Sequence, residues 1–261
     1  MFNKKEIRKI LEIAKDAGNI IMEYYLDYKD PDVSLKKDDS VVTKADLAAN
    51  DLIIKKLGKL FPDIAIVSEE NSEENNLKAS KNDQYFMIDP LDGTSSFIKK
   101  SNEFTVNIAL IKDSQPIFGV IYLPAKDLMY FTDENNQSQK IKNYSKNPDQ
   151  ANKIATANNK DNLIVICTKR EPEKSEIIAD LNNRNISVKE IISISSSYKF
   201  CLIAEGKADL YPRKVNIKAW DVAAGHAIVN AAGGSMINCN IKKELEYRLG
   251  NGFDIPFFEV F

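Results

Sequence analysis

Two carboxylates stand three residues apart in the sequence, directly after an apolar run. Asp89 and Asp92 follow residues 85–88, and Pro90 and Gly93 shape the chain between and after them. Magnesium takes oxygen ligands and is usually held by one or two carboxylates together with substrate phosphate. The same residues also fit an Asp-Pro turn followed by an Asp-Gly turn, which is common on protein surfaces. The segment alone therefore leaves a metal site and a surface turn open.

The residues around Asp92 could bind an anion next to such a cation. The carbonyl group of Leu91 is a third candidate oxygen ligand. Gly93, Thr94 and Ser95 have small side chains. Their backbone N–H groups could converge on a phosphate, more so if a helix begins there. A cation site beside a phosphate site is the chemistry that this segment indicates.

Two further acidic positions also lie at the ends of predicted elements. Glu69 and Glu70 follow the apolar run 64–67, and Asp221 opens a predicted helix after Trp220. A solvated strand edge explains the first pair equally well, and a helix N-cap explains Asp221. If the fold brings these carboxylates together with Asp89, they repel one another unless a cation neutralises them.

The sequence lacks the motifs of several other chemistries. It has a single histidine, His226, so a histidine-rich metal site is excluded, and no Gly-x-Ser-x-Gly element accompanies it. We expect His226 to be structural. Neither a Gly-x-x-x-x-Gly-Lys loop nor a Gly-x-Gly-x-x-Gly fingerprint is present. The cysteines Cys167, Cys201 and Cys239 form no Cys-x-x-Cys pair, and we expect buried, reduced thiols.

The overall charge gives no general attraction for polyanions. The 261 residues include 36 Lys and Arg and 38 Asp and Glu, a net charge of −2 at pH 7. We therefore expect no nucleic-acid partner, and an anionic substrate must be held by local groups. The first 25 residues are charged and periodic, and no apolar run reaches membrane length. We expect no transmembrane segment and a cytoplasmic location.

Apolar periodicity predicts a mixed α+β (α/β) protein in two halves, residues 1–150 and 151–261, joined within the polar segment 133–160. Residues 71–83 are expected to form a loop, and the strand at 235–238 is expected to be the last. The predicted helices are 7–21, 45–60, 173–182, 197–205 and 221–232, and the predicted strands are 64–67, 85–89, 106–112, 119–123, 128–132, 163–168, 188–192, 208–211 and 235–238.

Three motifs in order resemble the inositol monophosphatase superfamily of magnesium-dependent phosphatases. They are Glu69-Glu70, the run from Asp89 to Thr94, and Trp220-Asp221 with Gly225. Within this superfamily, the flanking residues resemble the CysQ-type 3′(2′),5′-bisphosphate nucleotidases. Ser95-Ser96 departs from the charged pair that is typical of those nucleotidases. The runs that carry this closer resemblance are 97–100, 103–111, 198–206, 210–213 and 220–226.

This resemblance implies a five-layered α-β-α-β-α sandwich that binds two or three Mg²⁺ ions. The implied metal ligands are Glu69, Asp89, the Leu91 carbonyl, Asp92 and Asp221. The implied catalytic residues are Glu69 together with Thr94 and Asp46, which would orient and deprotonate a metal-activated water, and Glu70 would support the ligands from behind. Asp46 also fits an ordinary helix cap, and Thr94 an ordinary turn residue.

The resemblance also implies a small phosphorylated substrate, 3′-phosphoadenosine 5′-phosphate, which would be hydrolysed to AMP and phosphate. Candidate substrate-binding residues are Gly93, Thr94, Ser95, Ser197, Lys199 and Arg213. Inositol monophosphate or fructose 1,6-bisphosphate, turned over by the same chemistry, stay open as substrates. A catalytically silent nucleotide sensor is an alternative of another class. We expect a lid at residues 30–40, and a homodimer is left open.

Overall fold

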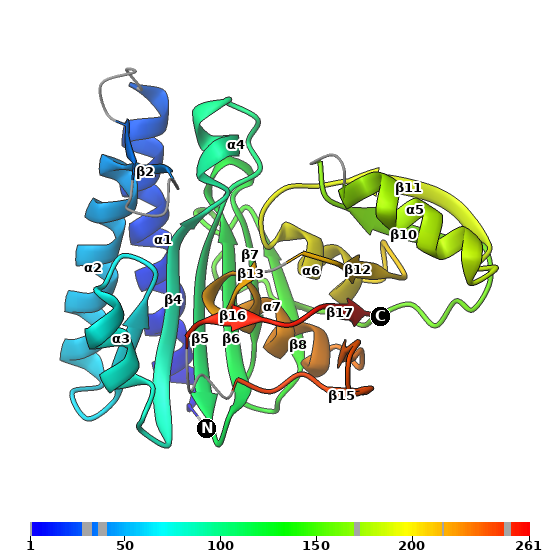
Figure 1. The fold of residues 1–261 in the computed structure, drawn as a ribbon. Helices are drawn as coiled ribbons and strands as arrows, with labels where there is room; N and C mark the ends of the chain where they lie inside the picture. The colour runs from blue at the N-terminus through cyan, green and yellow to red at the C-terminus, as the bar shows by residue number, and fades with distance from the viewer. Residues whose placement is uncertain (1, 28–32, 36–40, 170–172, 216, 248–251) are drawn as a thin grey trace.

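The computed structural model describes residues 2–27, 33–35, 41–169, 173–215, 217–247 and 252–261, and its centre is a seven-stranded sheet (Figure 1). The strands lie in sequence order, and every neighbouring pair after the first, parallel pair of β3 and β4 is antiparallel. The sheet consists of β3 Ala65–Ser68, β4 Gln84–Asp92, β5 Thr105–Lys112, β6 Gln115–Leu123, β7 Leu128–Thr132, β8 Ser138–Lys142 and β9 Asn152–Lys153.

Two long helices, α1 Lys4–Leu26 and α2 Lys44–Leu60, cover one face of this sheet (Figure 1). Each begins at a capping box, formed by Asn3 with Glu6 and by Thr43 with Asp46. The apolar stripe of α1 packs with α2 and with alternate residues of β4 to β6 in one hydrophobic core. Both helices that the periodicity predicts in this half are confirmed.

The opposite face of the sheet carries α6 Tyr198–Ala204 and α7 Ala219–Ala231. The approach of α7 to the sheet is so close that a Cβ atom on Gly119 of β6 would collide with the carbonyl oxygen of Ala224. A Cβ atom on Gly225 would collide with Phe200 of α6 in the same way. Glycine at position 119 therefore permits the close approach of α7 to the sheet, and glycine at position 225 permits the close approach of α7 to α6.

A second β layer and a fifth, helical layer complete the sandwich (Figure 1). A four-stranded sheet in the order β12-β17-β14-β15 packs on α6 and α7, and the parallel pair β10-β11 adjoins it through a bridge between Val165 and Leu210. Ile177 and Leu181 of α5 cover β10. The bounds are β10 Leu163–Cys167, α5 Glu173–Asn183, β11 Val188–Ser193, β12 Tyr211–Arg213, β14 Met236–Asn238, β15 Lys243–Glu244 and β17 Phe258–Val260.

The predicted mixed α+β class and the α-β-α-β-α layers are confirmed, but three local predictions are wrong. The expected loop at 71–83 contains helix α3 Glu73–Ala79, which Ser72 caps and which the buried Asn76 ties to the backbone of Ser68. The polar segment 133–160, which the sequence predicts to be a connection between two halves, contains the strands β8 and β9. The large sheet therefore continues past residue 150. Among the described residues after 238, three short strands are present, namely β15, β16 Asp254–Ile255 and β17.

Several further short elements complete the described structure. Of the expected lid at 30–40, only β1 Val33–Leu35 is described, so that prediction lies outside the described residues. β1 pairs with β2 Val41–Thr43. The others are α4 Thr94–Ile98, η2 Pro124–Lys126 and β13 Ile217–Lys218, which pairs with β16. In the described part of the chain, no helix is long and apolar enough to span a membrane.

Candidate metal-dependent active site

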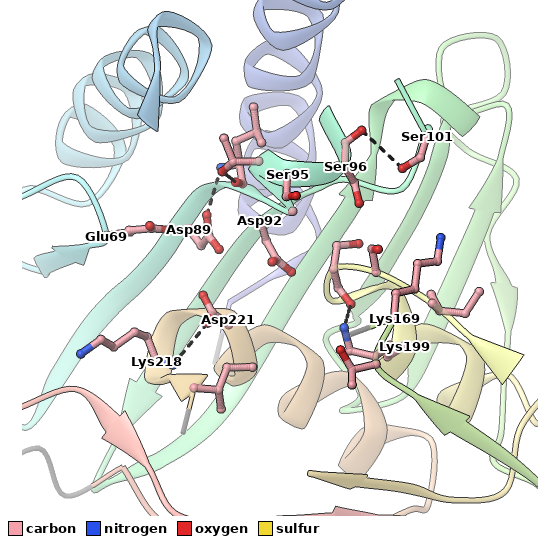
Figure 2. A pocket seen from close by; sticks show the side chains of 18 of the residues that line it. Glu69, Asp89, Asp92, Ser95, Ser96, Ser101, Lys169, Lys199, Lys218 and Asp221 are labelled. Carbon is pink, nitrogen blue, oxygen red and sulfur yellow. Dashed lines mark hydrogen bonds between the residues drawn. The ribbon is translucent and has the colours of Figure 1, made fainter. Parts of the chain in front are cut away.

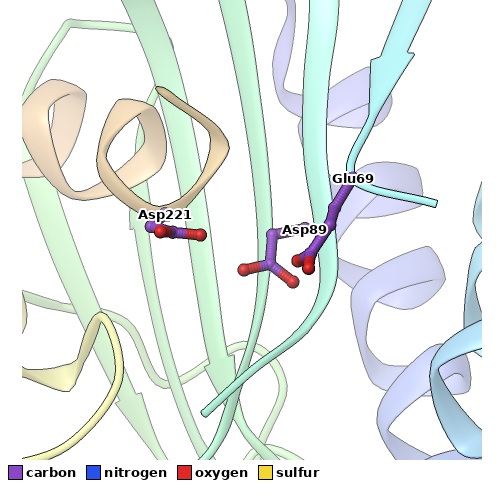
Figure 3. Close-up of side chains that lie close together, drawn as sticks. All are labelled: Glu69, Asp89 and Asp221. Atoms are coloured by element: carbon purple, nitrogen blue, oxygen red, sulfur yellow. The ribbon is translucent and has the colours of Figure 1, made fainter. Parts of the chain in front are cut away.

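Three carboxylates that are distant in the sequence meet at one edge of the large sheet. Glu69 directly follows β3, Asp89 lies in β4, and Asp221 lies in the first turn of α7. An oxygen of each carboxylate lies within 4.8 Å of an oxygen of the other two (Figure 3). The parallel pairing of β3 with β4 places Ser68 beside Ile88 and so brings Glu69 next to Asp89. The predicted cluster is therefore present.

A β-bulge places Asp92 on the same face of the sheet as Asp89. In a regular strand, residues three apart point to opposite faces. Here Asp89 lies opposite Asn107 and Asp92 lies opposite Thr105, which are only two residues apart on β5. The extra residue restores the common direction of both aspartates. The side chain of Leu91 packs into the core on the α1 and α2 side of the sheet.

The carboxylate cluster is electrostatically unfavourable by itself. Burial, followed by the charges of Glu69, Asp92 and Asp221, holds the pKa of Asp89 well above its usual range. Burial, followed by Asp92 and Glu69, does the same to the pKa of Asp221. Oδ2 of Asp89 is buried without a hydrogen-bond partner among the described residues. An all-oxygen donor set with an unpaired buried oxygen fits a hard divalent cation such as Mg²⁺.

Asp46 and Thr94 meet beside this cluster, as the resemblance implies. The hydroxyl of Thr94 lies 3.3 Å from Oδ1 of Asp46 and 3.3 Å from the carbonyl oxygen of Leu91. Oδ2 of Asp46 accepts from the N–H of Thr43 at 2.9 Å and from its hydroxyl at 2.5 Å. The two interpretations of Asp46 are thus compatible, because one oxygen caps α2 and the other faces Thr94.

A pocket of about 840 Å³ joins these carboxylates to a basic region. Figure 2 shows Lys169 and Lys199 across the pocket from Glu69 and Asp89. Most of the predicted site residues line the pocket. The lining consists of Glu69, Asp89, Leu91, Asp92, Gly93, Thr94, Ser95, Ser96, Lys99, Ser101, Thr168, Lys169, Ile194, Ser195, Ser196, Lys199, Arg213, Ile217, Lys218, Asp221 and Asp254.

The two predicted cationic residues line the pocket but are largely buried. Lys199 is 8% exposed, and its ammonium group donates to the carbonyl oxygen of Ser196 at 2.7 Å. Burial lowers the pKa of Lys199 to about 8, although Asp92 acts in the opposite direction. Nη1 of Arg213 lies 3.0 Å from Oε2 of Glu173, and both side chains are more than nine-tenths buried. Because Arg213 is already paired with a carboxylate, Lys199 is the better candidate of the two for binding an anion.

Asp46, Ser197 and Glu70 lie outside the pocket lining. Ser197 is 1% exposed, and its hydroxyl lies 2.5 Å from Oδ2 of Asp92 instead of facing the pocket. Its expected contact with the substrate thus has no support in this geometry. Glu70 lies in the turn after Glu69, where its N–H group lies 3.4 Å from the hydroxyl of Ser68.

Sequence reasoning missed Lys169 and its partner Glu103. Nζ of Lys169 lies 2.7 Å from Oε2 of Glu103, which also accepts from the N–H of Ser195 at 2.9 Å. Glu103 thus bridges the two halves of the chain at the rim of the pocket. Lys169 follows Thr168 at the end of the predicted strand 163–168, so the strand-end position that singled out Asp89 could have found it.

The chain belongs to the inositol monophosphatase family, because the model of that family matches residues 3–255. It is 37% identical over 255 residues to the 3′(2′),5′-bisphosphate nucleotidase CysQ of Salmonella typhimurium, which covers 97% of this chain and 98% of the relative. The protein of the same name from Buchnera aphidicola is 42% identical over 236 residues, or 89% of this chain and 84% of the relative.

A solved structure supports the same relationship. The crystal structure of CysQ from Bacteroides thetaiotaomicron superposes with a TM-score of 0.82 at 33% sequence identity. The match covers 99% of this chain and 97% of the other. The layers described above are therefore those of a bacterial member of the inositol monophosphatase family.

Proposed function

We propose that this enzyme hydrolyses 3′-phosphoadenosine 5′-phosphate to AMP and phosphate. The observation that carries the proposal is the pocket, which has Glu69 and Asp89 on one side and Lys169 and Lys199 across from them. A bisphosphate needs a cation at each end, and a simple monophosphate does not. The names of the relatives from Salmonella and Buchnera agree with this substrate class.

We propose that Glu69, Asp89, the Leu91 carbonyl, Asp92 and Asp221 hold two or three Mg²⁺ ions. Bound magnesium would supply charge neutralisation and a lower pKa for water. The unpaired Oδ2 of Asp89 and the raised pKa of Asp89 and Asp221 support this ligand set. Glu70 would support the ligands from the turn behind Glu69.

In this proposal, Thr94 and Asp46 prepare the nucleophile. The Thr94 hydroxyl donates to Asp46, so its oxygen is free to accept from the attacking water. Asp46 is 2% exposed, and one oxygen of its carboxylate belongs to the capping box at the start of α2. The N–H groups of Gly93, Thr94 and Ser95 would bind the phosphate, because the first N–H groups of a helix have no partner within the helix.

The second phosphate of the substrate would lie toward Lys199, with Lys169 and Arg213 beside it. Lys169 and Arg213 are already paired with Glu103 and Glu173. Lys199 donates only to a backbone carbonyl in its described contacts, and it is the residue that we expect to contribute most. A cytoplasmic location and a homodimer stay predictions.

A substrate panel with magnesium tests the proposal. Turnover of 3′-phosphoadenosine 5′-phosphate, inositol 1-phosphate, fructose 1,6-bisphosphate and NADP would be compared, with excess chelator as the control. We expect the adenosine bisphosphate to have the highest kcat/KM and chelator to abolish turnover. Faster turnover of inositol 1-phosphate would refute the substrate, full activity in chelator would refute the metal chemistry, and nucleotide binding without turnover would support a sensor.

A further inference from the structure

A buried amide lies next to the carboxylate cluster and takes no part in the proposed chemistry. Asn107 of β5 is 1% exposed and lies directly opposite Asp89 of β4. Side chains of directly opposed residues lie on the same face of a sheet, so this amide is a neighbour of the Asp89 carboxylate. Oδ1 of Asn107 has no hydrogen-bond partner among the described residues. Burying an amide oxygen without a hydrogen bond costs free energy, so we expect this side chain to have a function.

The other end of this amide reaches Asp92 through a hydroxyl group. Nδ2 of Asn107 donates to Oγ of Ser197 at 2.8 Å. Oγ of Ser197 lies 2.5 Å from Oδ2 of Asp92 and 2.9 Å from the carbonyl oxygen of Asp221. A hydroxyl has a single proton to donate, and Asn107 occupies one of its acceptor positions. The shorter contact and the negative charge direct the proton of Ser197 to Asp92.

Ser197 holds the same oxygen of Asp92 a second time, because its backbone N–H also donates to Oδ2. Ser197 lies immediately before α6, which carries Lys199. The pair Asn107 and Ser197 therefore joins β5, the metal side of the pocket and the basic side of the pocket. This connection runs through buried residues, where water does not compete for the hydrogen bonds.

We propose that Asn107 and Ser197 are positioning residues that orient Asp92 for metal binding. The inference rests on the metal site of the proposed function. Asn107 fixes the direction of the Ser197 hydroxyl, and Ser197 fixes the carboxylate of Asp92. Groups behind metal ligands typically change metal affinity or activity by about 10–100-fold when they are removed.

Titration calorimetry with magnesium alone tests this role without any substrate. We expect Ser197→Ala and Asn107→Leu to weaken Mg²⁺ binding by about 10–100-fold, with a cooperative thermal unfolding transition retained in chelator. Thr132→Val is the matched control, because it removes a buried hydroxyl of the same sheet that accepts from the N–H of Gly119 at 3.1 Å, away from the pocket lining. This control should bind Mg²⁺ as the wild type does.

The double variant Ser197→Ala/Asn107→Leu separates a relay from two unrelated losses. Because Asn107 acts through Ser197, the double variant should bind Mg²⁺ no more weakly than Ser197→Ala, whereas independent effects would multiply. If Asn107→Leu does not fold, the Mg²⁺ affinity of Ser197→Ala compared with that of Thr132→Val tests the positioning role. Wild-type affinity in Ser197→Ala, or an equal loss in the control, would overturn the inference alone. A wild-type protein that binds no Mg²⁺ would overturn the proposed function as well.

Discussion

The hydroxyl of Thr94 lies 3.3 Å from Oδ1 of Asp46, although the two residues are 48 positions apart in the sequence. The other oxygen of Asp46 is held by Thr43 at the start of α2. The carboxylate of Asp46 thus joins the start of the long helix α2 to the turn that follows β4. This arrangement separates the stability of α2 from the chemistry of Thr94, and the two can be tested apart.

We predict that Thr94→Ala and Asp46→Asn lower kcat by about 10²–10⁴-fold with a much smaller change in KM, because their role arises when the water loses its proton. Thr43→Val is the control. It removes the hydroxyl contact to Asp46, but the N–H group of Thr43 still holds the same oxygen of Asp46, and Thr94 stays in place. We therefore expect a cost of about 1 kcal/mol of stability and little loss of kcat. Steady-state kinetics and thermal unfolding measure both, and a loss confined to KM would contradict the role.

We predict that Asp89→Asn abolishes magnesium binding but raises the thermal stability of the protein in chelator. Asp89 is buried among other carboxylates, and the substitution removes one of the repelling charges. The control Asp63→Asn makes the same charge change at an exposed position and should shift stability by less than about 0.5 kcal/mol. Undiminished magnesium binding by Asp89→Asn would show that this carboxylate is not a ligand.

We predict that Lys199→Met raises KM for the adenosine bisphosphate by about ten- to a hundredfold, since a charge-assisted hydrogen bond is lost. Turnover of a monophosphate should change little. In the wild type, KM for the bisphosphate should rise as the pH passes about 8, where Lys199 loses its charge. An equal loss on both substrates would indicate a role in the fold.

The same lysine gives a prediction for stability against pH. The pKa of Lys199 is lowered from 10.5 to about 8 in the folded protein, chiefly by burial. Between these two values the unfolded chain binds more protons than the folded one, so the contribution of Lys199 to the free energy of unfolding rises with pH. Lys199→Met should remove this rise and stabilise the protein at pH 7, as denaturant unfolding at several pH values would show.

We predict that Gly93→Ala destabilises the protein by about 1–3 kcal/mol. Gly93 has a φ of 89°, and an added Cβ atom would lie 2.9 Å from the carbonyl oxygen of Glu103. The control is Gly58→Ala, in the last turn of α2 with open space around it, which should stabilise by about 0.4–1 kcal/mol. Chemical denaturation measures both, and a neutral Gly93→Ala would contradict the strain.

The carboxylates of the cluster could be found as candidates in the sequence because each directly follows or opens an element with a clear apolar period, and the resemblance implied that they are ligands. Glu69, Asp89 and Asp221 lie at such ends, and the fold needs only to bring the ends together. Helices α1 and α2 were equally clear, since their apolar stripes are long. The resemblance of the motifs implied that Asp46 acts on the attacking water, a role that its position at a helix start could not reveal.

The missed features depend on long-range pairing that leaves no local pattern. The contact of Lys169 with Glu103 joins residues that are 66 positions apart, and the hydrogen bond from the Ser197 hydroxyl to Asp92 joins residues that are 105 positions apart. Strands β15, β16 and β17 have two or three residues each, too few for a period to appear. The polar helix α3 is held by its cap and by Asn76, not by an apolar stripe.

The bulge in β4 frees a main-chain atom as well as aligning two side chains. The extra residue of a bulge has no place in the ladder of hydrogen bonds, so the carbonyl of Leu91 is available to a cation. Shortening the segment by deleting Leu91 would restore regular alternation and keep both aspartates on one face. Such a chain would retain every acidic side chain of the site. It would lose the Leu91 carbonyl, the Leu91 N–H group that donates to Oδ1 of Asp89 at 3.0 Å, and a buried core side chain. Magnesium binding by this chain would therefore report what the main chain of the bulge contributes, which no side-chain substitution can reach.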